Sequence, residues 1–242
     1  IPILKQAIGV FTSLNDSHGR AEALVELGRT YNMQSESAEA LTAYESALSM
    51  LTPTADIDLI RRIEIGIALI YILNDEVDEA QRMLESALGR ARVLQDRTKI
   101  ATALNNLAYV HLKKKHPEGA LQAIREAIEV HDPNSPVSFE STLWHSYGET
   151  LLETGRYEEA AETLQKALAK CIKSQDANGE ALCKTDYIRC QIALGRAEPR
   201  MVQMLEEASL IAERINSDRI RQRILDTESK LFEALGDFQK AL

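Results

Sequence analysis

Histidine, cysteine and paired acidic residues are the side chains best suited to catalysis or metal binding, and in this sequence they do not gather. The 5 histidines are scattered, and no pair has metal-ligand spacing backed by cysteine or acidic partners. Acidic pairs such as Glu158-Glu159 and Glu206-Glu207 fall where helix surfaces are expected, which favours solvated faces over acid–base catalysis. No phosphate-binding glycine loop, nucleophile elbow or calcium loop occurs. We therefore expect no catalytic residue, no metal and no cofactor, and any enzyme activity would belong to a domain outside this segment.

The composition favours a cytoplasmic protein without nucleic-acid or membrane partners. The 3 cysteines show no close pairing, and an odd number without a disulfide framework suits a reducing compartment. The sequence has no signal peptide and no apolar run of about 18 residues. A basic turn occurs at 113–115, but the net charge of −9 opposes binding to a phosphate backbone.

The structural elements that would hold a functional site follow a pattern that repeats along the chain. Two alanine series recur with a spacing of 40 residues: Ala40, Ala80, Ala120 and Ala160, and Ala7, Ala47, Ala87, Ala127 and Ala167. A third series keeps the same period, and each member is followed by a small residue: Leu27, Ile67, Leu107 and Tyr147. Several series in phase over four cycles indicate an internal repeat, which is typical of solenoid proteins.

Each repeat predicts two amphipathic helices joined by a short polar turn. In the first cycle Leu24, Leu27 and Tyr31 recur at helical spacing, and a second helical series follows the turn at 32–37. Aspartates recur where the first helices should begin and are expected to be N-caps: Asp16, Asp56, Asp96 and Asp176. Small residues such as Gly28 and Ala40 would let the two helices of a hairpin approach closely. Glu64 stands one repeat after Leu24, in a position where the first cycle has an apolar residue. Either the register of the second cycle is shifted there, or this part of the helix contact is open to water.

This pattern resembles the tetratricopeptide repeat. Leu27-Gly28, Tyr31, Ala40, Tyr44 and Ala47 match its consensus order, and residues 144–168 match it most closely. The commonest form of that repeat has about 34 residues, and the longer units in this chain resemble those of kinesin light chains and of bacterial signalling and regulatory proteins. The resemblance implies an all-α fold, a right-handed superhelical solenoid of antiparallel helix hairpins.

The resemblance covers nearly the whole chain, so we expect a single solenoid domain over residues 1–242. The expected parts are the second helix of a preceding unit at 1–14, full units at 21–52, 61–94, 101–132 and 141–174, a degenerate unit at 180–215, and the start of a truncated unit at 220–242. Because the first and last parts are incomplete units, we expect the chain to be a fragment of a longer protein.

In this family the first helices of successive hairpins line a concave groove, and the resemblance implies a binding site there. The expected groove residues are Arg29, Asn32, Ile65, Leu69, Ile72, Leu73, Asn105, Tyr109, Leu112, His145 and Glu149. The segment 63–73 is apolar nearly all the way round, so it is either covered by neighbouring helices or an apolar strip that receives a partner. By the same resemblance, Asn105 would hydrogen-bond the backbone of a bound peptide and Arg29 would take a carboxylate.

We therefore predict a protein–protein interaction module that binds a peptide or a helix in its concave groove. The resemblance further implies a sensory or regulatory arm of a larger bacterial signalling protein, such as a diguanylate cyclase or a transcription regulator. The alternative is a structural scaffold or self-association module without a switched output, in which case the chain would form a homo-oligomer. The expected partner is a protein or peptide, not a nucleic acid or a membrane.

Overall fold

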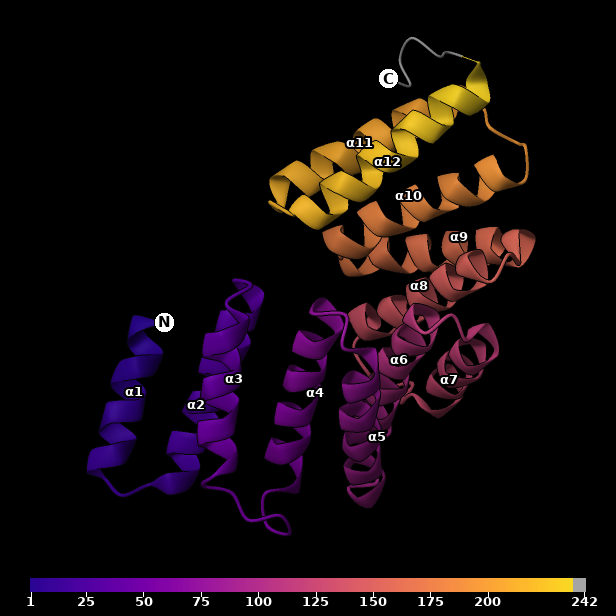
Figure 1. The fold of residues 1–242 in the computed structure, drawn as a ribbon. Helices are drawn as coiled ribbons and strands as arrows, with labels where there is room; N and C mark the ends of the chain where they lie inside the picture. Colours follow the sequence, from indigo (N-terminus) through magenta and orange to yellow (C-terminus); the bar gives the residue numbers. More distant parts are fainter. Residues whose placement is uncertain (237–242) are drawn as a thin grey trace. The chain divides into compact units, whose positions relative to one another are not determined.

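The computed structural model describes residues 1–236, and within them it contains twelve α-helices and no β-strand, which confirms the all-α prediction (Figure 1). The chain divides into two compact units, residues 1–114 (unit 1) and residues 115–242 (unit 2). Unit 1 contains α1 (Pro2–Ser13), α2 (Ser17–Met33), α3 (Ser37–Leu48), α4 (Ile57–Leu73), α5 (Val77–Val93) and α6 (Arg97–Lys113). Unit 2 contains α7 (Pro117–Val130), α8 (Val137–Glu153), α9 (Tyr157–Ser174), α10 (Ala177–Ala193), α11 (Arg200–Arg214) and α12 (Asp218–Leu235).

Three of the four expected aspartate N-caps are confirmed. An Oδ1 atom of Asp16, Asp96 and Asp176 accepts a hydrogen bond of 2.9, 3.0 and 2.9 Å, respectively, from the backbone N–H three residues later. Each bond satisfies a donor that the first helical turn leaves unpaired. Asp56 also precedes its helix, but the prediction of a capping bond is wrong there. Its Oδ2 atom instead accepts from the backbone N–H of Thr52 at 2.8 Å, so this carboxylate closes the preceding loop.

Most connections between helices, and the end of α12, turn through one residue in the left-handed conformation. These residues are Asn15, Ser35, Asp75, Gln95, Lys115, Gly155, Gln175, Gly195, Asn216 and Gly236. They recur about every 20 residues, and the two gaps in the series fall in loops that contain prolines, at 52–56 and 131–136. Seven of these residues are not glycine, and each such residue costs about 1–2 kcal/mol in this conformation. The packing of the flanking helices must therefore impose the turn.

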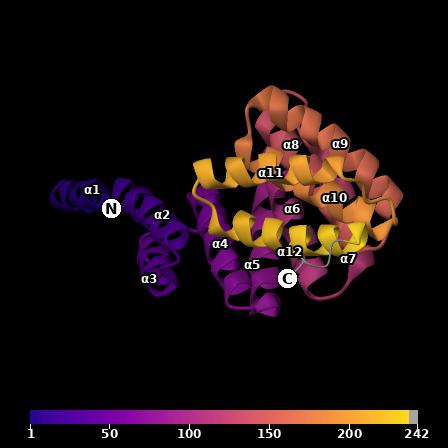
Figure 2. The ribbon, with the colours of Figure 1, turned by 90° about the horizontal axis from the view of Figure 1, so that it is seen from above.

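The two helices of a hairpin pack along each other, with small residues at the contact. Helix α2 packs on α3, α4 on α5, α8 on α9 and α10 on α11, and Figure 2 shows α8 beside α9. In the first hairpin Tyr44 is buried against Gly28, where an added Cβ would come within 2.8 Å of the tyrosine ring. Ala40 is fully buried in the same hairpin. Both small residues therefore have the predicted steric role.

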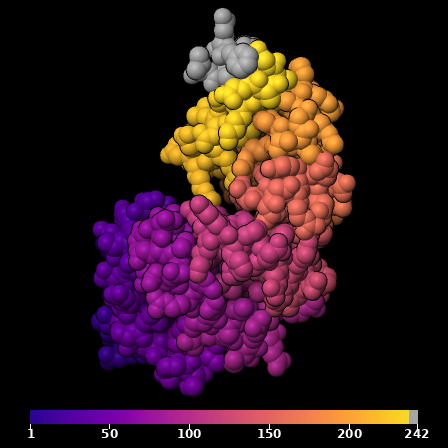
Figure 3. Space-filling model, turned by 45° about the vertical axis from the view of Figure 1, so that its right-hand side comes forward, coloured from indigo at the N-terminus to yellow at the C-terminus, as the bar shows by residue number. Residues whose placement is uncertain are grey.

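Hairpins also pack on their neighbours within each unit. In unit 1, α4 packs on both α2 and α3, and in unit 2, α10 packs on both α8 and α12. Figure 3 shows the segments of unit 2 following one another in sequence order, from pink through orange to the yellow helix α12. This succession of neighbour contacts is typical of solenoid repeats.

Glu64, which stands in an apolar position of the repeat, is buried rather than wet. One carboxylate oxygen accepts from the Ser86 hydroxyl at 2.7 Å, and both oxygens accept from Arg90 Nε at 3.0 Å. The buried charge is therefore paired within the α4–α5 hairpin. Helix α4 also lies 40 residues after α2 at both ends, so the register is not shifted.

The single domain and its six repeat units remain predictions. Within the two units, the helix pairs of four hairpins span 17–48, 57–93, 137–174 and 177–214, while α6 is the last helix of unit 1 and α7 the first of unit 2. The last expected unit, 220–242, begins within α12, and its residues 237–242 lie outside the described residues.

Candidate partner-binding site

Nine of the eleven expected groove residues lie on the first helices of unit 1, namely α2, α4 and α6. The apolar helix α4 is covered over most of its surface but not all of it. Leu69 and Leu73 are 38% and 63% exposed, whereas Ile65 is half-buried and Ile72 is buried. Two exposed leucines one turn apart therefore form an apolar patch, the α4 leucine patch, on an otherwise buried helix.

An ion-paired group of three residues joins α2 to α4. Glu26 accepts a hydrogen bond of 3.0 Å from Arg29 Nε on the same helix, and its other oxygen accepts from Arg62 of α4. Arg29 is the most exposed of the three, with 68% of its side chain accessible. A ligand carboxylate at Arg29 would have to compete with Glu26.

Both expected groove asparagines have an amide oxygen that is buried and unpaired. The Oδ1 atoms of Asn32 on α2 and Asn105 on α6 accept no hydrogen bond. A buried acceptor without a partner costs about 1–3 kcal/mol, so a donor that reached either oxygen would recover that free energy. Tyr109 and Leu112, which also lie on α6, are half-buried.

His145 and Glu149 lie on α8 of unit 2, and each is already paired. His145 Nε2 is 3.0 Å from Asp186 Oδ2 of α10, and Glu149 Oε1 accepts from Arg223 Nη1 of α12 at 2.8 Å. Asp186 and Arg223 are not predicted from the sequence, although α10 lies 40 residues after α8 at both ends, because periodicity does not specify which charged side chains meet. The available signal is that charged residues recur roughly one repeat apart, Asp186 at 41 residues after His145 and Arg223 at 37 residues after Asp186.

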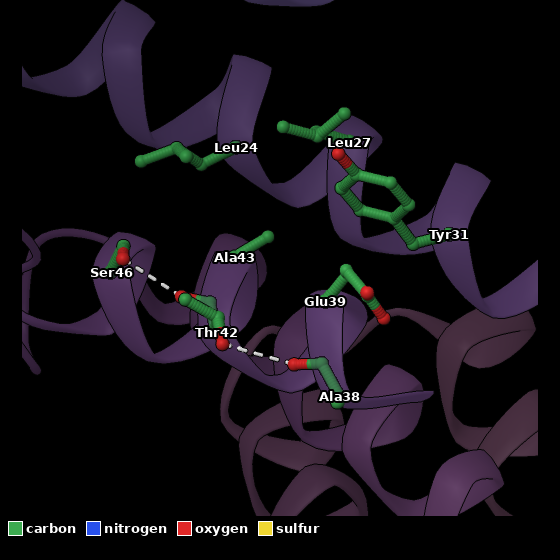
Figure 4. A pocket seen from close by; sticks show the side chains of 8 residues that line it. All are labelled: Leu24, Leu27, Tyr31, Ala38, Glu39, Thr42, Ala43 and Ser46. Carbon is green, nitrogen blue, oxygen red and sulfur yellow. Dashed lines mark hydrogen bonds between the residues drawn. The ribbon is translucent and has the colours of Figure 1, made fainter. Parts of the chain in front are cut away.

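A pocket of about 370 Å³ lies between α2 and α3 (Figure 4). Its lining residues are Leu24, Leu27, Tyr31, Ala38, Glu39, Thr42, Ala43 and Ser46. The Thr42 and Ser46 hydroxyls donate to backbone carbonyls one turn earlier on α3, at 3.0 and 2.7 Å. The pocket therefore offers mainly apolar walls, and it includes none of the expected groove residues.

The described residues contain no group of three or more His, Cys, Asp or Glu side chains placed to hold a metal ion. The three cysteines are buried free thiols, with the sulfur atoms of Cys171 and Cys183 4.0 Å apart. None of the helices in residues 1–236 combines the length and the apolar character needed to span a lipid bilayer.

Two family models match the middle of the chain. Models of the tetratricopeptide repeat match residues 59–132 and 118–175. The matched spans include residues 59–73 of the apolar helix α4 and the segment 144–168, whose sequence is nearest to the repeat consensus.

One curated relative and two of the similar solved structures are Rap proteins. The regulatory protein RapD of Bacillus subtilis (strain 168) is 23% identical over 179 residues, which are 72% of this chain and 48% of RapD, so the chain spans about half the length of this curated relative. The apo form of RapI superposes with a TM-score of 0.75 at 15% identity, covering 98% of this chain and 85% of RapI. A Rap protein complexed with Competence and Sporulation Factor gives a TM-score of 0.71 at 13% identity, covering 93% and 71% of the two chains. The resemblance predicted from the sequence is therefore confirmed: models of the tetratricopeptide repeat match within residues 59–175, and the chain has the fold of a helical solenoid.

Proposed function

We propose that this chain is a protein-interaction module that binds an extended peptide or a helix on the first-helix face of unit 1. One observation carries the proposal: α4 exposes the α4 leucine patch, and the first helices that precede and follow it in unit 1, α2 and α6, each carry an asparagine with an unpaired amide oxygen. Apolar anchors and unpaired hydrogen-bonding groups are the two features that a peptide site needs.

The leucines would supply the binding free energy. Leu73 is 63% exposed and Leu69 38% exposed, so a partner side chain that covered them would remove apolar surface from water. Fully burying a leucine side chain is worth about 1.5–3 kcal/mol, and these half-exposed side chains would contribute part of that.

The asparagines would fix the register of the peptide. The backbone N–H groups of an extended peptide are unpaired donors, and each would satisfy the amide oxygen of Asn32 or Asn105 after a small rotation of the side chain. Because the oxygens already bear the cost of burial without a partner, this pairing gains more than an exchange of one hydrogen bond for another.

The substitution Leu69→Glu tests this assignment. A peptide would be selected from a random library against the wild-type chain, and its dissociation constant would then be measured for the variant. We expect at least a tenfold weaker Kd, about 1.4 kcal/mol, because a carboxylate would be buried against the ligand's apolar anchor. Far-UV circular dichroism should be unchanged.

Val93→Glu is the matched control, because Val93 is 69% exposed on α5, a second helix of the same unit. It introduces the same charge and should leave the Kd within twofold of the wild-type value. Equal affinities of the wild type and Leu69→Glu would contradict the proposed site.

The regulatory role is a second step of the proposal. The relatives are named as regulatory and Rap proteins, one of them complexed with Competence and Sporulation Factor. This supports a cytoplasmic sensory or regulatory arm in which the bound peptide changes the output of a larger bacterial signalling protein, for which cyclases and transcription regulators are candidates. The alternative scaffold predicts self-association that persists in Leu69→Glu, which sedimentation velocity would detect.

A further inference from the structure

Six charged side chains form a cluster across three first helices of unit 2. They are His145, Glu149 and Glu153 of α8, Asp186 and Arg189 of α10, and Arg223 of α12. Asp186, at the centre, has no exposed surface. Its Oδ2 atom lies 3.0 Å from His145 Nε2, and its Oδ1 atom accepts from Arg223 Nη2 at 2.6 Å and from Arg189 Nη1 at 3.0 Å. One buried carboxylate therefore links α10 to both α8 and α12.

The charge of the cluster depends on His145. The two arginines have further partners, because Arg223 donates to Glu149 at 2.8 Å and Arg189 to Glu153 at 2.7 Å. With His145 protonated, three positive groups face three negative groups. With His145 neutral, the cluster carries one excess negative charge, and the fully buried carboxylate of Asp186 keeps only two of its three positive partners.

Ionisable groups from four helices of unit 2 surround His145. These are Glu149 of its own helix, Asp186 of α10, Arg223 of α12 and the Cys171 thiol of α9. Burial acts to lower the pKa of His145, but the hydrogen bond and charge of Asp186, together with the charge of Glu149, outweigh it. The pKa of His145 is therefore raised above the ordinary histidine value of about 6.5.

We propose that His145 is a proton-dependent switch for the packing of α8, α10 and α12. When it is protonated, a charge-balanced cluster holds the three helices together. When it is neutral, its Nε2–H still donates to Asp186, but the cluster has an excess negative charge and unit 2 opens more often. Because the folded-state pKa is raised, the stabilisation is complete below about pH 6.5 and is lost as the pH rises through the raised value.

The cysteines provide a direct readout of this opening. All 3 cysteines of the chain lie in unit 2, on α9 and α10, and each is fully buried, so a thiol reagent reacts only with opened molecules. Labelling by 4,4′-dithiodipyridine would be followed from about pH 6 to about pH 9, a range that brackets a raised histidine pKa. Dividing each rate by that of the urea-unfolded chain at the same pH removes the pH dependence of the thiols and gives a protection factor.

We expect the protection factor of the wild type to fall by up to tenfold per pH unit through the titration of His145, as linkage to one proton requires. In His145→Gln, which cannot be protonated, protection should be lower at pH 6 and independent of pH. His18→Gln is the matched control, because His18 also lies 3.0 Å from an aspartate, Asp56, but is exposed and in unit 1. It should follow the wild type.

A constant ratio of protection between the wild type and His145→Gln at every pH would overturn the proposal. If His145→Gln does not fold, an NMR titration of the wild type tests the proposal by itself. The His145 ring signal and the amide exchange rates of α10 would be followed in the same titration, and a ring titration without a matching change in α10 exchange would overturn the proposal equally.

Discussion

At Gly148, helix α8 is in close contact with the Leu164 side chain of α9. A Cβ added at this position would lie 2.6 Å from Leu164 Cγ, and Leu164 has no exposed surface into which it could move. Gly89 is the opposite case, since it lies inside α5 and a Cβ added there would meet nothing within 4 Å. The same chemical change therefore has opposite consequences at the two positions.

We predict that Gly148→Ala lowers the free energy of unfolding by about 1–3 kcal/mol through overpacking. Gly89→Ala should raise it by about 0.5–1 kcal/mol, because alanine stabilises a helix interior relative to glycine. Urea unfolding followed by circular dichroism measures both effects. Shifts of the two midpoints in the same direction would show that the α8–α9 contact does not restrict Gly148.

Small residues at close contacts can be predicted from the sequence, whereas the ionic partners of unit 2 cannot. Gly28 and Ala40 belong to series with a fixed period, so their burial follows from the repeat. The pair Arg223–Glu149 joins residues 74 positions apart, and periodicity does not specify which way two long side chains point. Unpaired oxygens such as Asn105 Oδ1 are also beyond prediction, because they depend on what neighbouring side chains fail to provide.

Among the helices, α7 shows how the repeat alanine sets the spacing between elements. Ala120 lies in the first turns of α7 and is fully buried, and α7 packs on α8. We predict that Ala120→Leu lowers the free energy of unfolding by about 1–3 kcal/mol, because the added methylenes have no free space. Thermal unfolding measures the loss.

Ala169→Leu is the control for this substitution, because Ala169 is exposed on α9 and a leucine there should change stability by less than about 0.5 kcal/mol. An unchanged melting temperature for Ala120→Leu would show that Ala120 does not lie at a close contact between helices. For single helices, the sequence predicts well where each helix begins. The predicted helix starts at Asp16, Asp96 and Asp176 are confirmed, and the capping bond fails only at Asp56, where a proline-containing loop takes up the carboxylate.

Over the whole chain, spectroscopic probes are divided unequally between the two units. The single tryptophan, Trp144, lies on α8 of unit 2, whereas helices of both units contribute to circular dichroism. Because each hairpin is stabilised mainly by its neighbours, repeat arrays need not unfold as one cooperative block. We predict that the urea midpoints from tryptophan fluorescence and from circular dichroism at 222 nm differ. Coincident transitions by both probes would show instead that the two units unfold together.

The left-handed turn residues recur about every 20 residues, which is half the period of the sequence repeat. The backbone conformation thus repeats with every helix and its turn. The side chains repeat only with every second helix, because first and second helices carry different residues. Gain or loss of 40 residues preserves both periods. A gain of 20 would keep every turn in place yet exchange the roles of first and second helices, moving the buried alanines of series such as Ala40 and Ala80 out of contact. Duplication and deletion in the gene should therefore change the length of such a protein in steps of two helices.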